Sequence, residues 1–171
     1  MLALHRSRVV APRRREAACS GPPPVRCHEH LEKPILSRDA LRVLVVEDDH
    51  DTAESLRTLL DLCGYLVVVA GTSQKGIEAA RKLEPHIVLC DIGLPDSDGY
   101  VVGSILRQSS ATASAHLVAV TGYGEVKDRL RALAAGFDQH LVKPVDPKML
   151  LRELQTVHWR ARIFKIPVPT T

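Results

Sequence analysis

Several polar residues of this chain follow short apolar runs. They are the carboxylates Glu47, Asp48, Asp49 and Asp91, which can bind a cation, together with the hydroxyl of Thr121 and the positive charge of Lys143. Carboxylates within a few ångströms of one another repel strongly unless a cation lies among them. Oxygen ligands at a partly open site suit Mg²⁺, which keeps some of its bound waters. These residues therefore predict a magnesium site beside a lysine, provided that the fold brings them together.

The apolar runs that precede these residues are short and rich in β-branched residues, as strands covered on both faces require. The five runs are LRVLVV (41–46), YLVVVA (65–70), HIVLC (86–90), HLVAV (116–120) and QHLV (139–142). They alternate with helical patterns, which predicts an α/β fold: a doubly wound, five-stranded parallel sheet with helices on both faces. In the strand order 2-1-3-4-5, strands one and three are neighbours, so Glu47, Asp48 and Asp91 converge at the ligand-binding edge.

Each predicted helix carries apolar residues at helical spacing. They are Ala53, Leu56, Leu60 and Cys63; Ile77, Ala80 and Leu83; Val102, Ile105 and Leu106; Val126, Leu130 and Leu133; and Leu150, Leu154 and Val157. Asp49 or Asp51 is expected to cap the first helix, and Ser73 the second. Asp96 and Asp98 are expected to serve the loop after the third strand.

The folded part is predicted to span residues 41–157. Residues 1–40 carry eight Lys and Arg against four Asp and Glu, a net +4, so residues 41–171 carry −1 of the total +3. The first segment is Pro-rich and lacks a sustained period, which indicates a disordered basic extension. Residues 158–171 are expected to form a short C-terminal tail. Because the folded part is slightly acidic, direct DNA binding is not expected.

Cysteine spacing and hydropathy indicate a cytoplasmic protein without membrane contact. The four cysteines show neither a disulfide framework nor a CxxC spacing, which fits a reducing compartment. Cys63 and Cys90 lie in apolar contexts and are interpreted as small core residues. The segment CHEH (27–30) is interpreted as an incidental turn rather than a metal site. No apolar stretch approaches the ~20 residues that a membrane helix needs.

The polar residues lie in motifs that resemble the receiver domain of two-component response regulators over residues 41–157. VLVVEDD resembles the first-strand motif; its acidic pair aligns with Glu47 and Asp48, and Asp49 is the alternative by a slip of one residue. IVLCDIGLPDSDG resembles the segment that carries the phosphoacceptor of this family. AVTGYG resembles the segment that carries its switch hydroxyl, and HLVKP resembles the segment that carries its lysine. The resemblance therefore implies that Asp91 is the phosphoacceptor, that Thr121 carries the switch hydroxyl and that Lys143 is the lysine of the phosphorylation site.

The resemblance implies a signalling domain rather than an enzyme. Asp91 would accept a phosphoryl group from a phosphohistidine of a sensor histidine kinase or histidine phosphotransfer protein. Mg²⁺ would be held by Asp48, Asp91 and the backbone carbonyl of Gly93, with Glu47 acting through a metal-bound water. Lys143 would support the phosphoryl oxygens. Phosphorylation would then change the face of the fourth helix, fifth strand and fifth helix, to which a downstream protein or a second copy would bind.

Four details refine this resemblance. His140 occupies the position that usually holds a switch aromatic, and its charge would add a pH dependence. Gly93 leaves no side chain two residues after the phosphoacceptor to orient an attacking water. Gly99 is expected to take a backbone conformation that other residues resist. Pro144 is expected to follow a cis peptide bond, which would direct Lys143 inward.

Other functions remain open at this point. The chain could be a single-domain regulator or a fragment of a hybrid kinase. A phosphohydrolase with an aspartyl-phosphate intermediate is the enzyme alternative, but it would place its nucleophile after the first strand, in an Asp-x-Asp arrangement. A flavodoxin-like cofactor binder needs a hydroxyl- and amide-rich phosphate loop after the first strand, where this chain has three carboxylates.

Overall fold

The computed structural model describes residues 40–122 and 124–163, with side chains up to Val157. The predicted basic extension, apart from Ala40, and the CHEH segment lie outside the described residues. The predicted C-terminal tail begins inside a helix, because the last helix runs to Ile163. Among the described residues, no helix is both long enough and apolar enough to cross a membrane.

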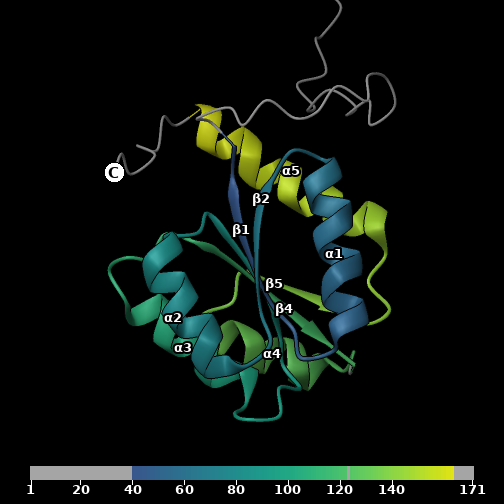
Figure 1. Cartoon of the computed structure of the whole chain (residues 1–171). Coiled ribbons are helices and arrows are strands. Elements are labelled where there is room, and N and C mark those ends of the chain that lie inside the picture. The colour runs from purple at the N-terminus through teal and green to yellow at the C-terminus, as the bar shows by residue number, and fades with distance from the viewer. Residues whose placement is uncertain (1–39, 123, 164–171) are drawn as a thin grey trace, which may run out of the picture.

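Five parallel strands form one sheet in the order β2-β1-β3-β4-β5 (Figure 1). The strands are β1 (Arg42–Val46), β2 (Leu66–Ala70), β3 (Ile87–Asp91), β4 (His116–Thr121) and β5 (Gln139–Val142). The predicted fold and strand order are therefore confirmed. The β3 strand includes Asp91 itself, so the carboxylate belongs to the last position of a buried strand.

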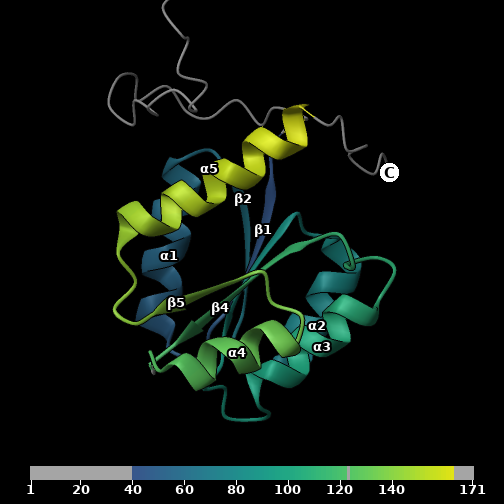
Figure 2. The same ribbon diagram turned by 180° about the vertical axis from the view of Figure 1, so that it is seen from behind.

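Helices cover both faces of the sheet, as Figures 1 and 2 show from opposite sides. The helices are α1 (His50–Leu62), α2 (Ser73–Leu83), α3 (Gly99–Gln108), α4 (Val126–Ala134) and α5 (Pro147–Ile163). Alternation along β1 makes the two cores: Leu44 and Val46 pack in the core beneath α2, α3 and α4, whereas Val43 and Val45 pack in the core beneath α1 and α5. Both faces of the central strands are thus buried, as the apolar runs predicted.

Of the two predicted helix caps, the one for α1 is confirmed and the one for α2 is not. Asp49 caps α1, because its carboxylate accepts a hydrogen bond from the backbone N–H of Thr52. The predicted cap of α2 was wrong by one residue. Thr72 is the cap, with its hydroxyl accepting from Lys75, and Ser73 is the first helical residue.

The apolar residues at helical spacing on α4 do not pack in the core. Val126, Leu130 and Leu133 are 76%, 61% and 49% exposed, and Ala132 is the buried residue of this helix. The i, i+4, i+7 spacing identified an apolar face correctly, but a spacing does not say which neighbour covers that face. The core expectation for the cysteines is confirmed for Cys90, which is buried, but not for Cys63, which is only partly buried.

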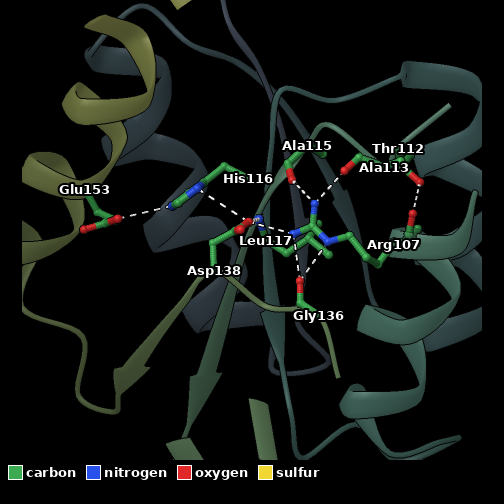
Figure 3. A network of polar contacts seen from close by, with 10 residues as sticks. Arg107, Thr112, Ala113, Ala115, His116, Leu117, Gly136, Asp138 and Glu153 are labelled. Carbon is green, nitrogen blue, oxygen red and sulfur yellow. Dashed lines mark hydrogen bonds and ion pairs between the residues drawn. The ribbon is translucent and has the colours of Figure 1, made fainter. Parts of the chain in front are cut away.

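An arginine ties together three segments at the amino edge of the sheet, where β4 and β5 begin (Figure 3). The Arg107 guanidinium, at the end of α3, donates to the carbonyls of Ala113 and Ala115 before β4 and of Gly136 before β5. It also donates to the carboxylate of Asp138 at 2.7 Å. Its five hydrogen bonds equal the number of N–H donors that a guanidinium carries.

The same group of contacts continues to α5 through a histidine (Figure 3). His116, the first residue of β4, lies with Nδ1 3.6 Å from the Asp138 carboxylate and Nε2 3.2 Å from that of Glu153. Asp138 also accepts from the backbone N–H of Leu117. We call Arg107, His116, Asp138 and Glu153 the amino-edge network.

Candidate phosphorylation site

The strand register brings the predicted site residues to the opposite, carboxyl edge of the sheet. Val46 pairs with Cys90, so the residues that follow them, Glu47 and Asp91, are neighbours at the ends of β1 and β3. At the end of β4, the Thr121 carbonyl accepts a hydrogen bond from the backbone N–H of Lys143 at 2.7 Å. A cleft of about 560 Å³ opens there, lined in part by Asp91, Thr121 and Lys143.

Three carboxylates gather at this edge. Glu47 and Asp91 are buried, with 3% and 7% of their surface exposed, and Asp48 is exposed. One oxygen of each lies within 4.8 Å of one oxygen of the other two. This donor set fits Mg²⁺, which prefers oxygen ligands and needs only one or two carboxylates besides water. Asp49, the alternative by a one-residue slip, is turned away to cap α1.

Lys143 bridges the two buried carboxylates. Its Nζ lies 2.8 Å from Asp91 Oδ2 and 2.8 Å from Glu47 Oε2. The peptide bond between Lys143 and Pro144 is cis, as predicted. We call Glu47, Asp48, Asp91 and Lys143 the carboxyl-edge site.

Burial and neighbouring charges shift the ionisation of this site. Burial raises the pKa of Glu47, and the negative charge of Asp91 raises it further, although Lys143 opposes both. Burial by itself lowers the pKa of Lys143, but its hydrogen bonds to Asp91 and Glu47 outweigh burial, so the pKa of Lys143 lies above its usual value. The lysine is therefore charged at neutral pH.

The loop after β3 holds the Asp91 carboxylate from the other side. The backbone N–H of Gly93 donates to Asp91 Oδ1 at 3.0 Å, which leaves Lys143 on Oδ2. The expected unusual conformation of Gly99 is wrong, because the glycines with positive φ among the described residues are Gly64 and Gly136. Gly99 is needed for space: a Cβ there would clash with the backbone of Asp91 and Ile92.

The two predicted switch residues occupy neighbouring strands. Thr121 is buried at the end of β4. His140 is partly buried on β5, opposite Ala119, and its Nε2 is buried without a hydrogen-bond partner among the described residues. The structure therefore places a hydroxyl beside the cleft and an unsatisfied histidine nitrogen one strand away.

The far wall of the cleft was not predicted from the sequence. Tyr100 on α3 and Arg131 on α4 line it, and the Arg131 guanidinium lies 4.2 Å from the centre of the Tyr100 ring. Arg131 also pairs with Asp98, which caps α3, at 2.6 Å. The spacing of Asp98 and Arg131 carries no local sequence signal, because the two residues are 33 positions apart.

The strand-end aspartate, the acidic pair and the bridging lysine all lie within a segment that matches a known protein family. Residues 43–155 match the response regulator receiver domain. The chain belongs to this family. Its receiver domain is a signalling domain rather than a classic enzyme.

Several individual proteins are similar to this chain. The receiver domain is 34% identical over 113 residues, 86% of the relative's length, to an uncharacterized 14.6 kDa protein of Leptolyngbya boryana. It is 35% identical over 120 residues to a probable transcriptional regulator, ycf27, of Pyropia yezoensis. A crystal structure of a putative response regulator from Chloroflexus aurantiacus superposes with a TM-score of 0.67 at 28% identity, covering 71% of this chain and 99% of that one.

The relatives that are named as regulators are longer than the matched region. The match spans 48% of the ycf27 protein and 48% of a DNA-binding dual master transcriptional regulator, RpaA, of Synechocystis, which is 29% identical over 116 residues. These names give no support to the expectation that this protein does not bind DNA directly.

Proposed function

We propose that the receiver domain accepts a phosphoryl group on Asp91 from a phosphohistidine of a sensor kinase or a phosphotransfer protein. One observation carries the proposal: the Asp91 carboxylate is buried at a strand end, held by Gly93 and Lys143, beside two further carboxylates. An Asp91 oxygen forms a bond to phosphorus as the bond from phosphorus to the histidine nitrogen breaks, and the imidazole leaves with the electron pair.

The residues around Asp91 divide the work of this transfer. Asp48 and Asp91, with the Gly93 carbonyl, would hold Mg²⁺, and Glu47 would act through one of its waters. When bound, the ion would neutralise the charge of the transferring group. Lys143 would neutralise the phosphoryl oxygens from the opposite side. The Gly93 N–H orients the nucleophile before the donor arrives.

The output would involve the face of α4, β5 and α5. The proposed switch draws the Thr121 hydroxyl toward the phosphoryl oxygens and gives the His140 ring room to turn inward. Both the phosphoryl group and a partner would then bias one two-state element. The exposed apolar side chains of this face favour partner binding, either by a downstream protein or by a second copy. They are Val126, Leu130 and Leu133 on α4, Val142 on β5 and Met149 on α5.

The proposal is tested by incubating the chain with acetyl phosphate and Mg²⁺ and measuring both intact mass and released phosphate. A receiver domain gains one phosphoryl group per chain, and chelation of Mg²⁺ prevents the gain. Asp91→Asn should lose this gain, whereas the control Asp51→Asn, which changes a fully exposed carboxylate on α1, should keep it. Continued release of phosphate from unrelated phosphomonoesters would favour the phosphohydrolase instead.

The switch has a separate readout. Thr121→Ala retains the nucleophile, the acidic residues and Lys143, so we expect it to be phosphorylated. It should not transmit the change, which can be followed by amide chemical shifts of residues 126–133 and 139–142 with a phosphoryl mimic. Equal shifts in wild type and Thr121→Ala would exclude this switch while leaving phosphorylation of Asp91 intact.

A further inference from the structure

The start of α2 is capped by a residue from the phosphoacceptor loop. The first N–H groups of a helix have no partner within the helix. At α2 the Thr72 hydroxyl serves only Lys75. The N–H groups of Ser73 and Gln74 donate to the two oxygens of Asp96, at 2.9 and 3.2 Å.

Asp96 is strongly suited to this contact. Its two backbone partners, Ser73 and Gln74 at the start of α2, lie 23 and 22 residues earlier in the sequence, so the bonds join two separate segments of the chain. The hydrogen bond from the Ser73 N–H is the largest of the causes that lower the pKa of Asp96. A negative charge at a helix N-terminus is also favourable by its interaction with the helix dipole.

The loop that carries Asp96 also orients the phosphoacceptor. It begins after Asp91, and its Gly93 N–H donates to Asp91 Oδ1. A second contact with α2 supports the first, since the Ser73 hydroxyl lies 3.4 Å from the Ser97 carbonyl. At its far end, the loop closes through a hydrogen bond from the Gly99 N–H to the Ile92 carbonyl. Asp96 thus attaches the loop to the start of α2, in addition to Leu94, whose buried side chain packs in the core beneath α2, α3 and α4.

We propose that Asp96 is a positioning residue for phosphoryl transfer. By capping α2, Asp96 holds the loop that contains Gly93. The Gly93 N–H donates to the nucleophile Asp91, and the Gly93 carbonyl is a predicted magnesium ligand. This inference rests on the proposed function of Asp91. Asp96 itself touches neither the transferring group nor the ion; it acts through the loop.

The test compares Asp96→Ala and Asp96→Asn with a matched control, Thr72→Ala. Both alanine variants remove caps from the start of α2, but Thr72 has no hydrogen bond to the loop. Three quantities are measured: the melting temperature, the amide resonance of Gly93 without Mg²⁺, and the acetyl phosphate reaction rate as a function of Mg²⁺ concentration.

We expect Asp96→Ala to shift the Gly93 resonance and to raise the Mg²⁺ concentration for half-maximal rate about tenfold, as loss of an outer support of a metal site does. Asp96→Asn keeps an acceptor for Ser73 and should recover part of this loss. Thr72→Ala should lower the melting temperature while leaving the Mg²⁺ dependence as in wild type.

Two results would overturn the inference: an unchanged Gly93 resonance and Mg²⁺ dependence in Asp96→Ala, or equal changes in Thr72→Ala, which would reduce Asp96 to a stabiliser of α2. Failure of the proposed function looks different. In that case the wild type itself takes up no phosphoryl group on Asp91, whatever the variants do.

Discussion

At the amino edge of the sheet every N–H donor of the Arg107 guanidinium has an acceptor, whereas at the carboxyl edge three carboxylates lie close together beside one bridging lysine. Both edges bring acidic and basic side chains together. They differ in how completely these groups are matched: at the amino edge an arginine and a histidine face two carboxylates, and every guanidinium donor has an acceptor, whereas at the carboxyl edge one lysine faces three carboxylates.

Because of this difference, we expect the amino edge to stabilise the fold and the carboxyl edge to carry the reaction. A satisfied polar network holds segments in one arrangement, because each group would lose its partner if a segment moved. A site with surplus negative charge gains by binding a cation, and a buried carboxylate near a cation is placed to react with a phosphoryl group. The domain is therefore expected to be stabilised at one edge and to react at the other.

The largest effect on stability is expected at the amino edge. Arg107→Ala removes the guanidinium donor from three carbonyls and leaves the Asp138 carboxylate with only the Leu117 N–H and His116, so the free energy of unfolding should fall by about 3 kcal/mol. Chemical denaturation measures this loss. Arg57→Ala is the control: it removes exposed ion pairs with Glu54 and Asp61, and should cost less than about 1 kcal/mol. If both variants lose equally little, the amino-edge network does not stabilise the domain.

The next largest effect is expected on the reaction rate at the carboxyl edge. Lys143→Ala removes the cation that contacts Asp91, and the rate of phosphorylation by acetyl phosphate should fall about 100-fold, as for other groups that stabilise developing charge. Lys127 lines the same cleft but pairs with Glu125, so Lys127→Ala should retain the wild-type rate. Equal rates in Lys143→Ala and wild type would remove the lysine from the proposed mechanism.

The smallest effect is expected on the pH dependence of stability, and it comes from His86 at the amino edge of the sheet. His86 Nδ1 accepts from the Arg42 N–H, and burial lowers the pKa of His86 from 6.5 to about 4. The unfolded chain therefore takes up a proton on this ring below pH 6.5 while the folded chain does not, so stability falls from pH 6.5 toward pH 4.

The His86 pKa difference corresponds to about 3 kcal/mol, or about 2 kcal/mol after allowance for partial exposure of the ring. His86→Asn keeps an acceptor but does not titrate, so its unfolding free energy should lack this fall. Denaturation curves of both proteins at several pH values decide the matter; parallel pH profiles would show that His86 does not contribute.

The residues of the carboxyl-edge site were predictable because each one ends an apolar run. The run fixes the strand, the strand fixes the edge, and parallel strands bring residues such as Asp91 and Lys143 together although they are 52 positions apart. The cis peptide bond before Pro144 could also be predicted, because cis peptide bonds occur almost entirely before proline.

Contacts that depend on the path of a loop were not predictable. The backbone N–H groups that bind Asp96 and the carbonyls that bind Arg107 are present at nearly every residue and leave no mark in the sequence. The exposure of the apolar face of α4 was not predictable for a related reason: spacing showed that Leu130 shares a face with Val126 and Leu133, and only the packing shows that this face is exposed to solvent.

The most direct test of the account is to locate the phosphoryl group after reaction with acetyl phosphate and Mg²⁺, by mass spectrometry of proteolytic fragments. We expect one modified residue, Asp91, in wild type and no modification in Asp91→Asn, whose side chain keeps its shape but is no nucleophile. A phosphoryl group on Asp48 or Asp96, or undiminished modification of Asp91→Asn, would contradict it.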